Sequence, residues 1–307
     1  MNVFKGFLSR VLCKKSFTSA VIIYFFNSIG NVGQGVFIKY YNAKLNMDLY
    51  EFMVLRCLIE IVLLFPFCLL YLIHFTKNLH IVIFVACLYA VDMLLFHRGL
   101  KTVAINTGSL ILLLVPLWIV VLGRIILKEK KFNCVNAFFL LICLCGVFFT
   151  ICNEVSFSGF NSGYLFLLAD AFAIPFGLIM QKKYSDCRPV VYAIFTNALV
   201  LALLGYCMSG YKIPDCSLEN IKGAFVVACF DIIEVACVYI AYQMTEPALL
   251  QPIRFTRILI SMLLSFVILA EKPTTSQIIS ASLIIGANAL SIWYSRKYQN
   301  DVGNIKK

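Results

Sequence analysis

The stretch VAINTGSLILLLVPLWIVVLGRIIL, residues 103–127, decides the fold class of this chain. Its single charged residue is Arg124, near the end. A helix needs about 20 mostly apolar residues to cross the hydrocarbon core of a bilayer. In lipid the backbone must form a helix or a closed barrel, and barrel strands are short and alternate in polarity. The stretch therefore predicts a transmembrane helix.

The rest of the chain has the same character. Of its 307 residues, 62% are hydrophobic and 13% are charged, whereas soluble domains have about 45–50% apolar and about 25% charged residues. We expect an all-α integral membrane protein with ten transmembrane helices. The predicted helices are residues 17–38, 49–73, 79–99, 103–127, 134–152, 162–181, 190–209, 221–244, 247–270 and 276–294.

These helices leave no room for a soluble catalytic domain. The chain has no G-x-S-x-G, H-E-x-x-H or P-loop motif. Its 13 cysteines are odd in number, lie mostly in apolar stretches and lack metal-ligand spacing with histidines. We therefore expect no enzyme, no metal and no cofactor.

The basic surplus indicates how the chain is oriented. The formal net charge is +11, which in a soluble protein would suggest a nucleic-acid partner. With ten helices, the side that holds both tails carries 15 of the 26 lysines and arginines, and the opposite side carries 6. By the positive-inside rule, both termini are expected in the cytoplasm of a cell inner membrane. The surplus then needs no nucleic-acid partner.

An internal repeat divides the chain into two halves. A shift of 142 residues lays residues 126–130 on 268–272 and Asp92 on Glu234, and a shift of 143 lays Asn27 on Asp170. Five helices are an odd number, so the second half would enter the membrane from the opposite face, as in many secondary transporters. The expected organisation is a tail (1–16), a first repeat (17–152), a linker (153–161), a second repeat (162–294) and a tail (295–307).

The order and spacing of several motifs along the chain resemble those of a known family. Each half has a helix that ends in an L-x-E-K turn, at Leu127 and Leu269, and residues 251–255 read QPIRF. From about residue 17 to 296 the chain resembles the drug/metabolite transporter superfamily, in particular its EamA-type members. Residues 31–41 leading to Leu55 and Arg56, with the Pro-x-Arg-aromatic segment 252–255, resemble the S-adenosylmethionine uptake transporters of obligate intracellular bacteria. The resemblance implies uptake of S-adenosylmethionine or a related amino-acid metabolite.

Ionisable residues inside the predicted helices are the main candidates for a substrate site, because a charge within the bilayer needs a partner or a cavity. Arg254 and Arg257 share one helical face beside Pro252. A guanidinium offers paired donors to a carboxylate, so Arg254 could bind the carboxylate of an amino-acid-like substrate. The alternative is an ion pair with Asp231 or Glu234. These acids could neutralise the arginines, hold a cationic substrate group or take up a coupling proton.

Further candidates come from the repeat and from the aromatic residues. Arg56 and Glu60 are four residues apart, which favours a structural pair along one helix, although the resemblance implies that Arg56 lines the cavity. Asp92, Asp170 and Asn27 are polar positions related by the repeat. Three tyrosines near the acids could stack on a heterocycle or a cation. They are Tyr89, Tyr239 and Tyr242.

The sequence thus predicts a secondary active transporter that moves a small polar metabolite by alternating access. Its expected partners are a small-molecule substrate, membrane lipids and either a coupling proton or an exchanged metabolite. An exporter of amino acids or cationic drugs in the same fold is the first alternative. A membrane-embedded enzyme or scaffold is the second, and the sequence indicates no oligomeric state.

Overall fold

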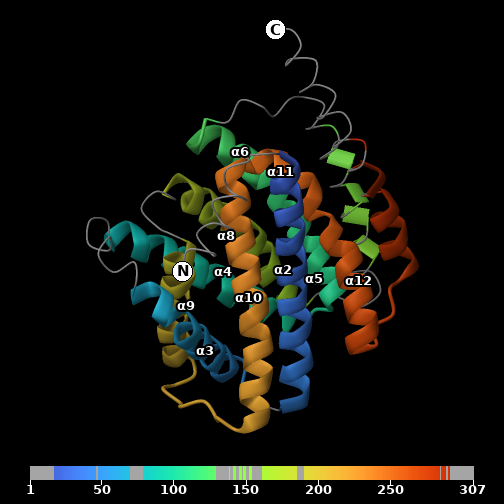
Figure 1. The fold of residues 1–307 in the computed structure, drawn as a ribbon. Coiled ribbons are helices and arrows are strands. Elements are labelled where there is room, and N and C mark those ends of the chain that lie inside the picture. The colour runs from blue at the N-terminus through green and yellow to red at the C-terminus, as the bar shows by residue number, and fades with distance from the viewer. Residues whose placement is uncertain are drawn as a thin grey trace.

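Long apolar helices dominate the structure, which is a computed structural model (Figure 1). It describes residues 17–45, 48–69, 79–128, 161–184, 190–283, 285–287 and 290, with isolated residues between 138 and 153. The helices are α2 (Phe17–Leu45), α3 (Leu49–Leu69), α4 (Leu79–Leu100), α5 (Ile105–Ile111), α6 (Val115–Ile126), α8 (Ser162–Lys183), α9 (Val190–Met208), α10 (Leu218–Met244), α11 (Pro247–Arg254) and α12 (Thr256–Leu269).

By length and composition, eight helical segments in the described residues could cross a membrane, and they correspond to eight of the ten predicted helices. A shorter apolar helix, Thr275–Ala287, covers part of the predicted tenth. Most of the predicted fifth helix, residues 134–152, lies outside the described residues. The protein is therefore an all-helical membrane protein, as its composition indicates.

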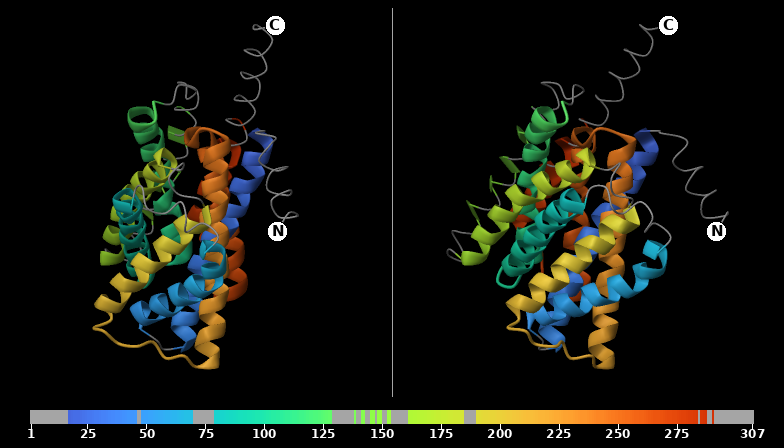
Figure 2. Two further views of the ribbon diagram at one scale, coloured as in Figure 1. Left: turned by 60° about the vertical axis from the view of Figure 1, so that its left-hand side comes forward. Right: turned by 90° about the vertical axis from the view of Figure 1, so that its left-hand side faces the viewer.

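The helices pair according to the internal repeat. Helix α2 packs along α10, α4 packs against α8, and α3 packs against α9 (Figures 1 and 2). The shifts of 142 and 143 relate α2 to α8 and α10 to α4. The α2–α10 and α8–α4 contacts are therefore the same contact formed twice, once in each direction across the two halves.

The fourth and the ninth predicted helices are each interrupted, and the two breaks are at equivalent positions in the repeat. Between α5 and α6, residues Leu112–Leu114 form a short 3₁₀ helix, and Phe255 separates α11 from α12. The shift of 142 lays Leu112–Leu114 on residues 254–256. Each break has a proline nearby, but at a different register position: Pro252 precedes Phe255, and Pro116 opens α6 directly after Leu112–Leu114. The stretch 103–127, predicted as one helix, is thus a broken helix.

The ends of the two broken helices also match. Lys128 has φ 56° and Ala270 has φ 54°, a left-handed conformation that is uncommon for residues other than glycine. The two residues are 142 positions apart. The repeat found in the sequence therefore extends to the backbone conformation of the turn that follows each broken helix.

Small residues set the helices close together where the halves meet. A Cβ atom on Gly30 of α2 would lie 2.8 Å from the Glu234 backbone nitrogen and 2.9 Å from the Phe230 carbonyl oxygen of α10. Between α4 and α8, a Cβ on Gly163 would lie 3.0 Å from the carbonyl oxygen of Gly99. Such close approach is typical of helix packing in membranes. It brings the polar side chains of α2, α4, α8 and α10 around one interior space.

Candidate functional site

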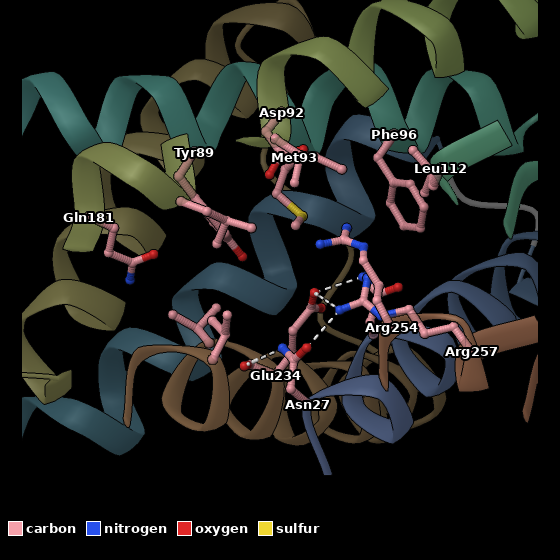
Figure 3. Close-up of a pocket in the computed structure, with 15 residues that line it drawn as sticks. Asn27, Tyr89, Asp92, Met93, Phe96, Leu112, Gln181, Glu234, Arg254 and Arg257 are labelled. Carbon is pink, nitrogen blue, oxygen red and sulfur yellow. Dashed lines mark hydrogen bonds and ion pairs between the residues drawn. The ribbon is translucent and has the colours of Figure 1, made fainter. Parts of the chain in front are cut away.

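A polar cavity lies inside the bundle, between α2, α4, α8, α10 and the broken helices (Figure 3). It contains about 520 Å³ of space between atoms, part of it open to solvent. Its lining consists of Asn27, Asn31, Tyr89, Asp92, Met93, Phe96, Leu112, Ile174, Leu178, Gln181, Glu234, Val235, Val238, Arg254 and Arg257.

Arg257 forms one side of the cavity and is held by its neighbours. Its Nη2 donates to Asn27 Oδ1 at 2.7 Å and lies 4.0 Å from Glu234 Oε1. Asn31 Nδ2 donates to the same Glu234 oxygen at 2.7 Å, and Asn27 Nδ2 donates to the Glu234 carbonyl oxygen at 2.8 Å. These contacts hold Glu234 beside Arg257, while Glu234 Oε2 and the Nε and Nη1 of Arg257 have no hydrogen-bond partner among the described residues.

Arg254 is placed differently, although it lies only one turn away. Its guanidinium projects across the cavity toward α4, which carries Asp92 and Met93 (Figure 3). Within the described residues, no side chain forms a hydrogen bond or an ion pair with it, and its buried Nε has no partner. A buried guanidinium without a protein partner is costly in a membrane interior. It is therefore the group most available to an anionic ligand.

Two carboxyl groups lie across the cavity from the Arg257 side. Asp92 lines the cavity, and Asp170 of α8 is fully buried behind it, with the two side chains within hydrogen-bonding reach of each other. Neither oxygen of Asp170 accepts a hydrogen bond from a donor in the described residues. Both carboxyl groups lie within electrostatic reach of Arg254.

A separate ion-pair network holds α3 to α10. Arg56 Nε lies 3.3 Å from Glu60 Oε1, and Arg56 Nη1 lies 3.5 Å from Asp231 Oδ1. Tyr89 and Gln34 donate to the same Asp231 oxygen at 2.7 and 2.8 Å. The predicted structural pair of Arg56 and Glu60 is confirmed. Neither Arg56 nor Asp231 lines the cavity, and their ion pair joins α3 to α10.

Two of the predicted tyrosines lie away from the cavity. Tyr239 and Tyr242 line a smaller pocket of about 180 Å³ with Gln181, Lys182 and Gln243. The Tyr242 ring stacks on Tyr24 at a centroid distance of 5.8 Å, and its hydroxyl accepts from Gln251 Nε2 at 3.3 Å. Tyr242 therefore contributes to packing between α2 and α10.

The structure brings together about half of the residues that the sequence singled out. Lining the cavity are Asn27, Tyr89, Asp92, Glu234, Arg254 and Arg257, whereas Arg56, Asp170, Asp231, Tyr239 and Tyr242 lie outside it. Sequence reasoning missed Asn31, which lies one turn after Asn27 and was detectable as a second amide on that face. It also missed the uncharged Phe96 and Gln181. Among the described residues, no group of His, Cys, Asp or Glu could hold a metal ion.

Comparisons with known proteins agree with this architecture. The sequence pattern of the EamA-like transporter family matches twice, over residues 18–152 and 161–293. A solved crystal structure of a protein has the same fold, with a TM-score of 0.67 and 17% sequence identity, over 92% of this chain and 99% of that chain. No curated protein sequence matches the chain. The chain consists of two EamA halves and belongs to the EamA-like transporter family, whose members move small molecules and are not enzymes.

Proposed function

We propose that this protein takes up S-adenosylmethionine, or a related amino-acid metabolite, by alternating access of two inverted five-helix halves. The observation that carries the proposal is the Arg254 guanidinium, which faces the cavity without a partner among the described side chains. A substrate carboxylate could bind it through paired hydrogen bonds. The nearby Arg257 would then serve to orient Glu234, because its Nη2 is already engaged by Asn27 and Glu234.

The remaining lining supports a substrate with both charges and an aromatic base. Asp92 and Glu234 offer carboxylates to an ammonium or a sulfonium group, and Tyr89 and Phe96 offer aromatic rings. S-adenosylmethionine carries all of these groups. A substrate that brings one net positive charge would, together with Arg254, also balance the carboxyl pair of Asp92 and Asp170.

The proposed setting is a bacterial inner membrane with ten helices and both termini in the cytoplasm. The excess of lysine and arginine on the side of the tails supports this orientation. The repeated α2–α10 and α8–α4 contacts support two halves related by a pseudo-twofold axis. In such folds the substrate site lies at the interface of the halves, where the cavity is found.

The test is uptake of radiolabelled S-adenosylmethionine into liposomes that contain the purified protein, in competition with amino acids, nucleosides and organic cations. We expect Arg254→Ala to lower uptake by about 10- to 100-fold, the loss of a hydrogen bond to a charged group of about 1.5–3 kcal/mol. Arg254→Lys should retain part of the activity. Arg98→Ala, at an exposed arginine on α4 outside the cavity, is the matched control.

Two results would contradict the proposal at different levels. If a folded preparation exchanges none of these solutes, the substrate class is wrong. If uptake occurs but Arg254→Ala leaves it unchanged, the assignment of Arg254 is wrong. An exporter of amino acids or cationic drugs would need nearly the same groups, and it would move solute in the opposite direction in vesicles of defined orientation.

A further inference from the structure

A hydrogen bond crosses the interior between two residues that the repeat makes equivalent. Tyr89 of α4 donates through its hydroxyl group to Asp231 Oδ1 of α10 at 2.7 Å. The two residues are 142 positions apart, which is the shift that lays α4 on α10. Both helices line the cavity, but each packs mainly along a different partner, α4 along α8 and α10 along α2. The bond therefore links the two halves directly at equivalent positions.

The position of this bond in the repeat distinguishes it from other contacts between the halves. Alternating access in inverted repeats is largely a rocking of one half against the other around a fixed site. The pseudo-twofold axis relates the two open states, so a contact in one state has its equivalent contact in the other. For Tyr89 and Asp231, the equivalent contact is the same pair in reverse order. The bond can therefore persist in both states.

Contacts near the ends of the cavity lack this property. Lys39 Nζ on α2 donates to the carbonyl oxygen of Val103, which follows α4, at 3.3 Å. Lys182 Nζ on α8 donates to the carbonyl oxygen of Thr245, which follows α10, at 2.8 Å. The shifts of 143 and 142 lay the first contact on the second. Helices α2 and α10 run in opposite directions (Figure 1), so the two contacts lie at opposite ends, and a rocking motion that opens one end must loosen one of them.

The surroundings of Asp231 make it a fixed point. Its side chain is buried, Gln34 Nε2 donates to the same Oδ1 at 2.8 Å, and Arg56 Nη1 lies 3.5 Å from that oxygen. Tyr89 reaches this oxygen from the other helix pair through a hydroxyl group, which can rotate to follow its acceptor. A single hydrogen bond of this kind holds two atoms together and leaves rotation about them free.

We propose that the hydrogen bond between Tyr89 and Asp231 is the pivot of the transport cycle, a contact that persists while α2 with α10 and α4 with α8 rock about it. Asp231 is then a positioning residue, and Tyr89 combines this task with a ring that faces the cavity. The inference rests on alternating access in the proposed function but not on the identity of the substrate.

The experiment measures hydrogen–deuterium exchange and unfolding of the purified full chain in detergent, with no substrate added. Peptides that cover residues 100–105 report on the Lys39 end, and peptides that cover residues 243–247 report on the opposite end. A contact shared by two states does not change their ratio, so Tyr89→Phe should leave the ratio of exchange rates at the two ends within about twofold of the parent. It should still raise the unfolding equilibrium constant by about tenfold, because a hydrogen bond to a carboxylate is lost.

Two further variants supply the contrast. Lys39 also lies 2.7 Å from Glu271 of the second half, and both side chains are partly exposed, at 29% and 22%. Lys39→Ala removes contacts at one end only, so it should shift the ratio of exchange rates by about fivefold, the effect of a partly exposed ion pair. Tyr206→Phe is the matched control, because Tyr206 is exposed on α9 outside the cavity. It should change neither the ratio nor the unfolding constant.

The possible results separate the pivot from the proposed substrate. The pivot is overturned if Tyr89→Phe shifts the ratio as Lys39→Ala does, since the bond would then belong to one state. It is also overturned if Tyr89→Phe leaves the unfolding constant unchanged, since the bond would then contribute nothing. If Lys39→Ala does not move the ratio, alternating access fails and the pivot fails with it. A failure of S-adenosylmethionine uptake, with the exchange results as expected, contradicts only the substrate.

Discussion

The two sides of the cavity occupy equivalent positions in the repeat, yet only one places hydrogen-bond donors beside its carboxylate. On the Glu234 side, which we define as Asn27, Asn31, Glu234 and Arg257, amide donors and a guanidinium surround the carboxylate. The Asp92 side consists of the equivalent residues Asp170, Ile174, Asp92 and Val115. Here the donors are replaced by a second carboxyl group and two apolar side chains.

The two halves differ in which of them supplies the positive charges of the site. Arg254 and Arg257 have Leu112 and Val115 as their equivalents, so both cations of the site come from the second half. Arg257 is engaged by the Glu234 side, whereas Arg254 faces the Asp92 side and the open cavity. The Glu234 side, built from residues of both halves, therefore engages one of the two cations. The other cation, Arg254, and the Asp92 side are the groups that a substrate charge would complete.

Removal of Arg257 should produce the largest loss of stability among the variants that distinguish the two sides of the cavity. Arg257→Ala leaves the Glu234 carboxylate and the side-chain oxygen of Asn27 buried without their cation, and breaking a buried pair costs about 3 kcal/mol or more. We expect a clearly lower melting temperature in detergent, measured by differential scanning fluorimetry of the native cysteines or tryptophans. Arg254→Ala is the paired variant and should destabilise much less. Equal losses would contradict the distinction between the two arginines.

The close approach of α2 to α10 gives the next largest effect. Gly30→Ala would place a Cβ within 3 Å of the α10 backbone, and backbone atoms cannot move aside as a side chain can. Overpacking of this kind costs about 1–3 kcal/mol. The equivalent residue on α8 is Ala173, so Ala173→Gly is the control and should cost at most about 1 kcal/mol, the helix-propensity difference. A thermal shift of similar size in both variants would mean that the two contacts are equally tight.

The sequence predicted which residues occupy equivalent positions in the two halves. The shifts of 142 and 143 identified Asp92 as the equivalent of Glu234 and Asn27 as the equivalent of Asp170. Most of the helices were predicted from the length of the apolar stretches alone. The different roles of Arg254 and Arg257 could not be predicted, because they share one helical face and differ only in which neighbours reach them. The break near Phe255 was expected from Pro252, whereas the equivalent break at Leu112–Leu114 was missed, although Pro116 opens α6 directly after it.

Neutralisation of either carboxyl group of the Asp92–Asp170 pair should stabilise the protein. Asp170→Asn makes the Asp92 side resemble the Glu234 side, where Asn27 stands at that position. Both Asp170 oxygens lack a donor in the described residues, so we expect the variant to be more stable by about 1 kcal/mol. Asp92→Asn should have a similar effect. The double variant should gain little more than either single, because the first substitution already removes the repulsion; additive gains would contradict a coupled pair.

The smallest expected effect comes from supplying Asp92 with the donor that Glu234 already has. Asn31 donates to Glu234 at 2.7 Å, and its equivalent, Ile174, lines the cavity on the Asp92 side. In an Ile174→Asn background, the amide can donate to the Asp92 carboxylate as Asn31 does to Glu234. The stability gained by Asp92→Asn should then fall by half or more, from about 1 kcal/mol. Ile174→Leu is the control and should leave that gain unchanged. If Ile174→Asn also leaves it unchanged, the missing amide is not what makes the two sides differ.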